Sequence, residues 1–482
     1  MKILLVFKSD FLIIPIGIRT LCSVLEKAGF TVIIMDLSLE RNYLNKIKVY
    51  APDIIGFSAD SFSFKYFLEL SKKLKSQINY FSIFGGPHPT LMPEIISEES
   101  IDAICIGEGE QAFVELANHL QKNQDITAIK NLWVKQNGSI FKNDIRNLVE
   151  NLDSLSHPDI KILKKYHAYS SFTTYDITTS RGCPYNCPYC INHFYRNLFA
   201  GKGRYVRRRT VDNVIEELQI AKKELNLKTI FFVDELFTFD KKWLKEFAPK
   251  YIEHIHLPFE VLTRIDDIDE PTIKLLCKMG FKVARVGIES GNEKLRFDLL
   301  ERKITDKQIL ETTKLLHQNK LTIFGYNMLG LPEENIKKAF ETLELNAKCK
   351  ITYPMTFMFH PFPNINLTKY SIQENYINNY SERFSKLSNK CEIEIKDKKQ
   401  IERLYYLFYF GVKLPFTIPL IKVLVKLPLN VLYFLIFHFM RAIIILFIIR
   451  SPSVKIIINY YPRKWYSVIL NKLFYKNNVS TK

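Results

Sequence analysis

Three cysteines in one short stretch constrain this chain more than any other feature. Cys183, Cys187 and Cys190 lie within eight residues, in TSRGCPYNCPYCIN, directly after a strand-like run. Two prolines and a glycine disfavour a helix there, so we expect the thiols on a loop. The other five cysteines are scattered singly among apolar segments. This usage predicts a metal site in a reducing, cytoplasmic setting rather than a disulfide framework.

Two kinds of metal centre fit this cysteine spacing. Thiolates are the normal ligands of iron–sulfur clusters, and three of them on a [4Fe-4S] cluster leave one iron open to a further ligand. Alternatively, His193 follows Cys190 closely enough to complete a zinc site of three cysteines and one histidine. Such zinc sites are common and also contain CxxC elements. Spacing alone leaves both centres open.

Residues 1–124 alternate short apolar runs with amphipathic stretches. The alternation is typical of α/β structure, and it predicts a Rossmann-like, doubly wound parallel sheet. The predicted strands are Ile3–Phe7, Thr31–Met35, Ile54–Phe57, Phe81–Phe84 and Ala103–Ile106, and the predicted helices include Ile18–Ala28 and Phe64–Ser76. Ligands of such sheets lie beyond the carboxyl ends of the strands. Glycines at two of these ends would let a bulky ligand approach, although tight turns explain them equally well.

The rest of the chain divides into three parts. Residues 125–171 form a connector, residues 172–390 a second α/β domain, and residues 391–482 a mainly helical C-terminal extension. Six strand–helix repeats in the second domain predict a (β/α)6 partial TIM barrel with its active site at the carboxyl ends of the strands. The predicted strands are Thr173–Thr179, Thr229–Val233, Phe259–Thr263, Val283–Ile288, Thr322–Met328 and Met355–Phe359. The predicted helices include Asp212–Leu225, Pro271–Met279 and Asp306–Asn319.

The cysteine motif resembles that of radical S-adenosylmethionine (SAM) enzymes, including Tyr189, where the family has an aromatic residue beside the adenine. The resemblance implies that the three cysteines hold a [4Fe-4S] cluster and that SAM binds its open iron. An electron from the cluster would then release a 5'-deoxyadenosyl radical, with a reducing protein such as flavodoxin or ferredoxin as the donor. It also implies SAM contacts at later strand ends. These are Asp234 and Glu235 in FFVDELF, Arg264 in VLTRIDD, and Glu289 and Ser290 in RVGIESGNEKL.

The first domain resembles the cobalamin-binding domain found at the N-terminus of many radical SAM enzymes, in PDIIGFSAD, IFGGPHPT and DAICIGEGE. The resemblance implies that cobalamin contacts the strand ends. The residues concerned are Ser58, Gly85, Gly86, Gly107, Glu108 and Gly109. The sequence departs from other cobalamin proteins in one respect, because it lacks the Asp-x-His-x-x-Gly motif and His88 does not fit it. We therefore expect no histidine of this domain to ligate the cobalt of a bound cobalamin.

The two resemblances together imply a cobalamin-dependent radical SAM enzyme that methylates an unactivated carbon of a small or lipid-like substrate. A radical SAM cyclase, mutase or dehydrogenase without functional cobalamin is the second interpretation, and a zinc-binding nucleic-acid module is the third. The first domain offers only Cys22 and Cys105 as further cysteines. This is short of the extra set in radical SAM enzymes that methylthiolate tRNA, so nucleic acid is disfavoured as a substrate.

Most of the net charge of +18 lies at the C-terminus, where residues 401–482 hold twelve Lys and Arg and one acidic residue. Residues 427–449 are long and apolar enough to cross a bilayer, yet they include Arg441, which is costly in hydrocarbon. Basic residues among apolar and aromatic ones are typical of interfacial helices. We favour peripheral association with the inner face of the membrane over a span, and a helical appendix packed on the barrel stays equally open.

A second basic feature follows the cysteine motif. Residues 201–204 read GKGR, and Arg207, Arg208 and Arg209 form a run directly after them. Such residues can bind a phosphate, a substrate carboxylate or the side chains of cobalamin. Runs of like charge are more often solvated surface. We therefore predict that the arginine run is a solvated face.

Overall fold

The first domain is built on a seven-stranded sheet of order β2-β1-β3-β4-β5-β6-β7. The computed structural model describes residues 1–9, 14–170, 172–378 and 390–443 of the chain. The strands are β1 (Lys2–Phe7), β2 (Thr31–Asp36), β3 (Ile54–Ser58), β4 (Phe81–Gly85), β5 (Ala103–Cys105), β6 (Leu132–Gln136) and β7 (Ser139–Lys142). The first five pair in parallel, which confirms the predicted Rossmann-like sheet. An antiparallel hairpin, β6 and β7, turns at Asn137 and Gly138 and extends this sheet beyond residue 124.

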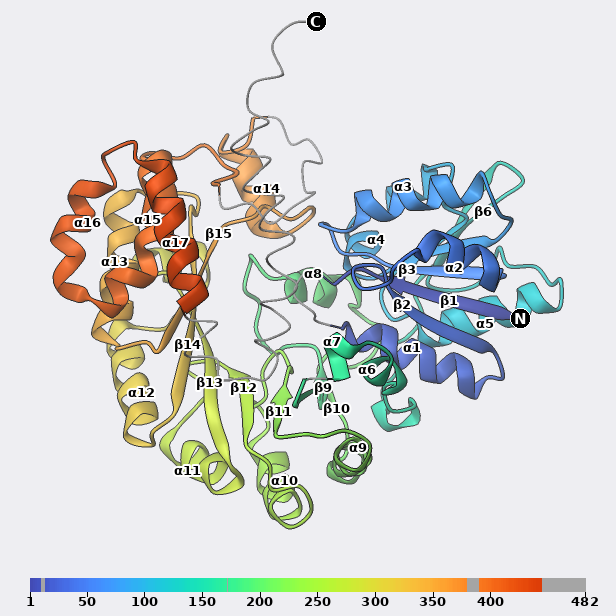
Figure 1. Ribbon diagram of the computed structural model, residues 1–482, viewed down its shortest axis with the longest axis horizontal. Coiled ribbons are helices and arrows are strands. Elements are labelled where there is room, and N and C mark those ends of the chain that lie inside the picture. Colours follow the sequence, from blue (N-terminus) through green and yellow to red (C-terminus); the bar gives the residue numbers. More distant parts are fainter. Residues whose placement is uncertain (10–13, 171, 379–389, 444–482) are drawn as a thin grey trace, which may run out of the picture.

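Helices cover both faces of the first sheet (Figure 1). Alternate residues of β1 point to opposite faces, so Leu5 packs with α1 and α5 while Leu4 packs with α2 and α3. The helices are α1 (Ile16–Lys27), α2 (Tyr43–Tyr50), α3 (Phe64–Lys75), the short α4 (Pro87–Leu91) and α5 (Glu110–Gln121). Two short helices, α6 (Lys161–Lys165) and α7 (His167–Ser170), lead into the second domain.

The second domain is a six-stranded parallel sheet of order β15-β14-β13-β12-β11-β8, which leaves β8 and β15 as its edges. The strands are β8 (Thr174–Ile177), β11 (Thr229–Phe232), β12 (Phe259–Thr263), β13 (Phe281–Glu289), β14 (Thr322–Leu329) and β15 (Tyr353–Met358). A two-stranded ribbon, β9 (Ser180–Arg181) and β10 (Arg207–Arg208), lies apart from this sheet. The arrangement confirms the predicted partial barrel.

Helices lie between successive barrel strands, and polar side chains cap all of them except the first. They are α8 (Ile191–Leu198), α9 (Val211–Glu224), α10 (Lys241–His254), α11 (Glu270–Met279), α12 (Asp306–Gln318) and α13 (Ile336–Lys348). From α9 to α13, the side chain before the first turn accepts a hydrogen bond from a backbone N–H of that turn. These caps are Thr210, Asp240, Asp269, Thr305 and Asn335. Capping fixes where each helix starts and therefore where each strand-end loop stops.

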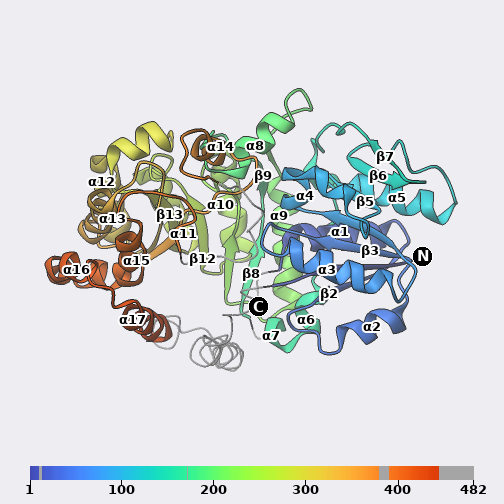
Figure 2. The ribbon, with the colours of Figure 1, turned by 90° about the horizontal axis from the view of Figure 1, so that it is seen from above.

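Helix α14 (Asn366–Gln373) ends the second domain and lies beside α8, as Figures 1 and 2 show. The helices of the C-terminal region are α15 (Lys398–Lys413), α16 (Ile418–Leu424) and α17 (Asn430–Ile443), and they pack on the barrel side away from the first domain. Within the described residues, no helix is both long and apolar enough to cross a membrane. The apolar stretch 427–449 lies only partly within this range, because residues 444–449 are outside the described residues.

Candidate active site

A cavity of about 480 Å³ lies between the two domains. Its walls come from the strand ends of both sheets and from α8, which lies between the domains (Figure 1). The six residues predicted to contact cobalamin all line it: Ser58, Gly85, Gly86, Gly107, Glu108 and Gly109. Asp234 and Glu235, which follow β11, line the same cavity. The structure therefore brings residues predicted for two different cofactors to one cavity.

Glycine has two different uses at the first sheet's edge. Gly86 has a φ of 101°, and a Cβ there would lie 2.8 Å from the carbonyl oxygen of Ala59. Gly107 also has a positive φ, and a Cβ there would overlap the ring of Phe199. A Cβ at Gly85, by contrast, would meet no atom closer than 3.8 Å. The first two glycines are thus needed for packing of the chain itself, whereas Gly85 leaves the cavity open.

Glu108 joins the two domains through buried ion pairs. Its Oε1 accepts hydrogen bonds from Arg181 at 3.0 Å and Arg207 at 2.7 Å, and its Oε2 accepts from Arg207 at 3.1 Å and from the backbone N–H of Val149. Glu110 also pairs with Arg181. Burial raises the pKa of Glu108, but the two guanidinium groups outweigh it and hold the pKa below its ordinary value. The carboxylate that was predicted to contact cobalamin is therefore already engaged by the protein.

Arg207 and Arg209 are buried and Arg208 is half-buried, so the prediction of the arginine run as a solvated face is wrong. Arg207 pairs with the carboxylate described above, and Arg209 pairs with Glu217 of α9. Arg208 stacks 4.1 Å from the ring of Trp243, and burial lowers its pKa to about 10. Arg207 and Arg208 have partners from elements distant in sequence, which a local run of like charge does not reveal, and Arg209 pairs with the helix that directly follows it.

The cysteine motif forms a loop between β9 and α8. Cys190 precedes α8, and its Sγ accepts a hydrogen bond from the backbone N–H of Asn192 at 3.5 Å. The backbone N–H of Cys190 in turn donates to the carbonyl of Cys187. All three thiols are free. Burial raises the pKa of Cys190 to about 12, so a bound metal would have to favour its thiolate form. Three free thiols on one loop fit the donor set of an iron–sulfur cluster.

His193 does not complete a zinc site with these cysteines. Its Nδ1 lies 3.1 Å from the carbonyl oxygen of Asn186, and its Nε2 lies 3.2 Å from the side-chain nitrogen of Asn366. Both ring nitrogens are therefore in hydrogen bonds within the protein. A zinc-ligating histidine needs one nitrogen directed at the metal. The geometry favours the iron–sulfur interpretation of the motif.

Arg264 lies beside the cluster loop. Its Nη1 donates to the Sγ of Cys187 at 3.5 Å, and its guanidinium lies 3.6 Å from the ring of Tyr185. Asp266 accepts two further hydrogen bonds from it, at 2.8 and 2.7 Å. The predicted SAM contact is thus held rigidly against the loop, with a positive charge next to a sulfur atom.

Tyr189 and Glu289 share a buried partner that the sequence did not reveal. Arg302 donates to the hydroxyl of Tyr189 at 3.1 Å and to the carboxylate of Glu289 at 3.4 Å. Burial raises the pKa of Glu289, and the charge of Arg302 opposes that rise. Glu289 also has a φ of 65°, which is rare for a side chain of its size. Strain and buried charge at the end of β13 are typical of functional sites.

Asp234 presents one free carboxylate oxygen. Its Oδ1 accepts hydrogen bonds from the backbone N–H and hydroxyl of Thr179 at 2.9 and 2.8 Å, and a third from the hydroxyl of Ser180. Its Oδ2 is buried and has no hydrogen-bond partner among the residues that the structure describes. Glu235 faces the cavity, and burial raises its pKa. A buried acceptor without a partner suits a cationic group of a ligand.

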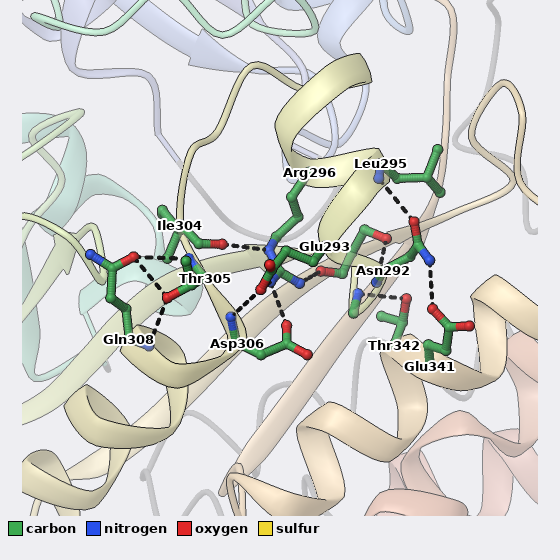
Figure 3. Close-up of polar contacts among 12 residues, drawn as sticks. Asn292, Glu293, Leu295, Arg296, Ile304, Thr305, Asp306, Gln308, Glu341 and Thr342 are labelled. Atoms are coloured by element: carbon green, nitrogen blue, oxygen red, sulfur yellow. Dashed lines mark hydrogen bonds and ion pairs between the residues drawn. The ribbon is translucent and has the colours of Figure 1, made fainter.

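Ser290 belongs to the loop after β13, which a buried arginine organises (Figure 3). Arg296 donates to the carbonyls of Ser290 and Ile304 at 2.7 and 3.0 Å and pairs with Asp306. The hydroxyl of Ser290 accepts from the backbone N–H of Asn292, so the side chain is engaged within its own loop. Of the predicted SAM contacts, Ser290 is the one that the structure turns inward, while Tyr189, Arg264 and Glu289 gather around the cluster loop.

The two folds and their shared cavity define a radical SAM barrel joined to a Rossmann-like cofactor domain. The B12 binding domain model matches residues 3–117, and the Radical SAM superfamily model matches residues 177–345. The chain therefore belongs to the radical SAM enzymes that carry an N-terminal B12-binding domain. This membership contradicts the interpretation as a zinc-binding nucleic-acid module.

Several relatives match more than two thirds of this chain. An uncharacterized methyltransferase of Pyrococcus horikoshii is 29% identical over 75% of this chain and 79% of its own length. The hopanoid C-3 methylase of Methylococcus capsulatus is 25% identical over 72% of this chain and 68% of its own length. Among solved structures, the radical SAM methyltransferase TsrM from Kitasatospora setae, with tryptophan and a SAM analogue bound, has a TM-score of 0.65. It is 17% identical over 79% of this chain and 77% of its own, and so shares the fold.

Proposed function

We propose that this protein is a cobalamin-dependent radical SAM methyltransferase. The observation that carries the proposal is the single cavity lined by strand ends of both domains. A methyl group carried in one domain can reach a substrate activated in the other only if both open to the same space. Relatives that are named as methyltransferases support this reaction class.

We assign residues of the second domain to two roles, the ligation of the cluster and the binding of SAM. When bound, the [4Fe-4S] cluster supplies the electron that cleaves SAM, and cobalamin supplies the methyl group. Cys183, Cys187 and Cys190 are the proposed cluster ligands, and Arg264 donates a hydrogen bond to the Sγ of Cys187. The free Oδ2 of Asp234 suits the ammonium of SAM. Tyr189 and Glu289, which share Arg302 as a partner, are further proposed SAM contacts.

The first sheet's edge is the proposed cobalamin site. Ser58, Gly85 and Gly109 leave space for a corrin ring there, and Gly86 and Gly107 keep the flanking loops close to the sheet. We propose a small or lipid-like substrate, consistent with the relative named as a hopanoid methylase. A reducing protein such as flavodoxin or ferredoxin would donate the electron. We further propose a cytoplasmic protein that associates with the inner membrane surface.

Anaerobic reconstitution of the full chain tests this proposal. With iron, sulfide, hydroxocobalamin and SAM under reduction, we expect cluster and corrinoid absorption, 5'-deoxyadenosine, and S-adenosylhomocysteine from use of SAM as methyl donor. Formation of 5'-deoxyadenosine by a protein that binds no corrinoid would favour a cyclase, mutase or dehydrogenase instead. Absence of 5'-deoxyadenosine from protein with a complete cluster would overturn the radical SAM assignment of the site.

A further inference from the structure

Helices α16 and α17 expose apolar side chains on the side away from the barrel, where a surface helix is ordinarily polar. Seventeen large hydrophobic side chains are exposed in the described residues, and nine of them lie between residues 414 and 435. The most exposed are Phe416, Leu420, Val423, Val431 and Leu435, at 79, 57, 56, 71 and 54%. We call these five residues the α16–α17 outer face, which includes Phe416 from the single helical turn just before α16. Exposed apolar side chains are normal singly, but a group of them on one face marks an interaction surface.

The same helices are apolar on their inner side as well. Ile421, Val425 and Tyr433 are fully buried against α13 and α15. A surface helix ordinarily buries one apolar stripe and presents a polar face to water. Here the inward apolar residues already pack against α13 and α15. The α16–α17 outer face is therefore a second apolar surface, which the barrel does not cover.

The face is preformed, because the turn between the two helices is fixed. Arg403 of α15 donates to the carbonyls of Val425 and Lys426 at 2.9 and 3.3 Å and to the side chain of Asn430 at 3.1 Å. The hydroxyl of Tyr433 donates to the carbonyl of Leu424 at 2.7 Å. These bonds satisfy carbonyls at the end of α16 and hold both helices at one angle. The exposed apolar residues are therefore not the result of a frayed helix end.

Charge identifies the partner of this face. Glu402 is the last acidic residue of the chain, and eleven Lys and Arg follow Arg403. Lys413, Lys422 and Lys426 lie on or beside these helices and are exposed, and of the three Lys422 pairs with Glu344 of α13. Apolar side chains bordered by lysine suit the boundary between lipid headgroups and acyl chains, and anionic headgroups add attraction for each lysine. A second copy of this chain would bring the same basic residues together and repel itself.

We propose that the α16–α17 outer face docks the enzyme on an anionic phospholipid surface. The inference deepens the membrane association proposed above and rests on it. Figures 1 and 2 show α16 at the end of the molecule opposite the first domain. Docking there leaves the first domain and the cavity between the domains clear of the bilayer plane. A lipid-like substrate would be met at the surface on which the enzyme sits.

Vesicle flotation of the full chain tests the face without requiring enzyme activity. We expect binding to vesicles containing phosphatidylglycerol and weaker binding to pure phosphatidylcholine. The combined variant Leu420→Ser, Val431→Ser and Leu435→Ser should lower affinity at least about tenfold, because three apolar side chains lose their contact with lipid. Lys426→Glu should weaken only the phosphatidylglycerol binding. Val49→Ser is the matched control, since Val49 is 86% exposed on the first domain and should change nothing.

Three outcomes would overturn the proposal. The first is equal flotation of the triple variant and the unmodified chain. The second is a lower melting temperature of the triple variant with unchanged flotation, which would mean that residues 444–482 cover the face. The third is conversion of a dimer to a monomer in light scattering, which would mean a contact between two copies. In none of these cases does the result bear on 5'-deoxyadenosine formation, so this inference can fail while the proposed methyltransferase stands.

Discussion

At the carboxyl edge of the first sheet the chain presents mostly backbone, whereas at the same edge of the barrel it presents buried charge. Gly85 and Gly109 line the cavity without a side chain. The barrel edge places Asp234, Glu289 and Arg302 out of water. A large planar ligand needs close approach along its whole face, and glycine permits that approach. A small zwitterion such as SAM needs fixed charges at a few points.

The two edges are also destabilising in different ways, one through buried charge and the other through backbone strain. The barrel edge buries charged groups, and each has an opposite charge or hydrogen bonds that compensate it. The first edge places Gly86 and Gly107 in backbone conformations that other residues rarely adopt. Loss of one charge should therefore alter chemistry or leave an unpaired ion, while an added methyl group should strain the backbone. Variants on the two edges can separate these effects.

The largest effect is expected from the cluster loop. Cys187→Ala removes one of three proposed iron ligands, and we expect loss of the cluster and of all SAM-dependent 5'-deoxyadenosine. Iron and sulfide analysis, the visible spectrum and chromatography of 5'-deoxyadenosine measure this. Cys277→Ala is the control, because Cys277 lies in α11 outside the cavity. Normal cluster content in the Cys187 variant would show that this thiol is not a ligand.

The next largest effect is expected where the two edges meet. Glu108→Ala leaves the buried Arg207 without its carboxylate partner, while Arg181 keeps its pair with Glu110. We expect the free energy of unfolding to fall by about 3 kcal/mol, since an unpaired buried charge remains. Glu115→Ala breaks a half-exposed pair with Arg146 in the same domain and should cost less than about 1 kcal/mol. Denaturant unfolding of the two variants measures both free energies. Equal losses of stability in Glu108→Ala and Glu115→Ala would show that the ion pairs of Glu108 between the domains contribute no more than a surface pair.

The strands and the cluster loop could be predicted because their signals are local. Apolar runs bounded by glycine or polar residues placed β3, β4 and β12 within one residue of their observed ends. The cysteine spacing identified the cluster loop, and the structure adds that His193 is engaged elsewhere. Local signals of this kind depend only on neighbours in the chain.

The ion pairs of the site could not be predicted, because their partners are far apart in sequence. Arg181 lies 73 residues from Glu108, and Arg302 lies 113 residues from Tyr189. The arginine run after the cluster loop resembled surface for the same reason. A charge becomes a buried partner only when the fold brings its counter-ion to it, and periodicity carries no information on that distance. The sequence likewise predicted that Glu108 contacts cobalamin, because it does not show that Arg181 and Arg207 pair with this carboxylate.

Neighbouring glycines at the first edge give the smallest and most specific comparison. Gly86→Ala places a Cβ 2.8 Å from the carbonyl oxygen of Ala59 at a φ of 101°, and should lower the free energy of unfolding by about 2 kcal/mol. Gly85→Ala has no contact closer than 3.8 Å, so stability should change little while the new methyl group enters the cavity. We expect corrinoid affinity to fall in that variant, as measured by titration of hydroxocobalamin into a protein with an unchanged melting temperature. If Gly85→Ala binds corrinoid as tightly as the unmodified chain, the first edge does not hold the ligand through its backbone, and the distinction between the two edges is lost.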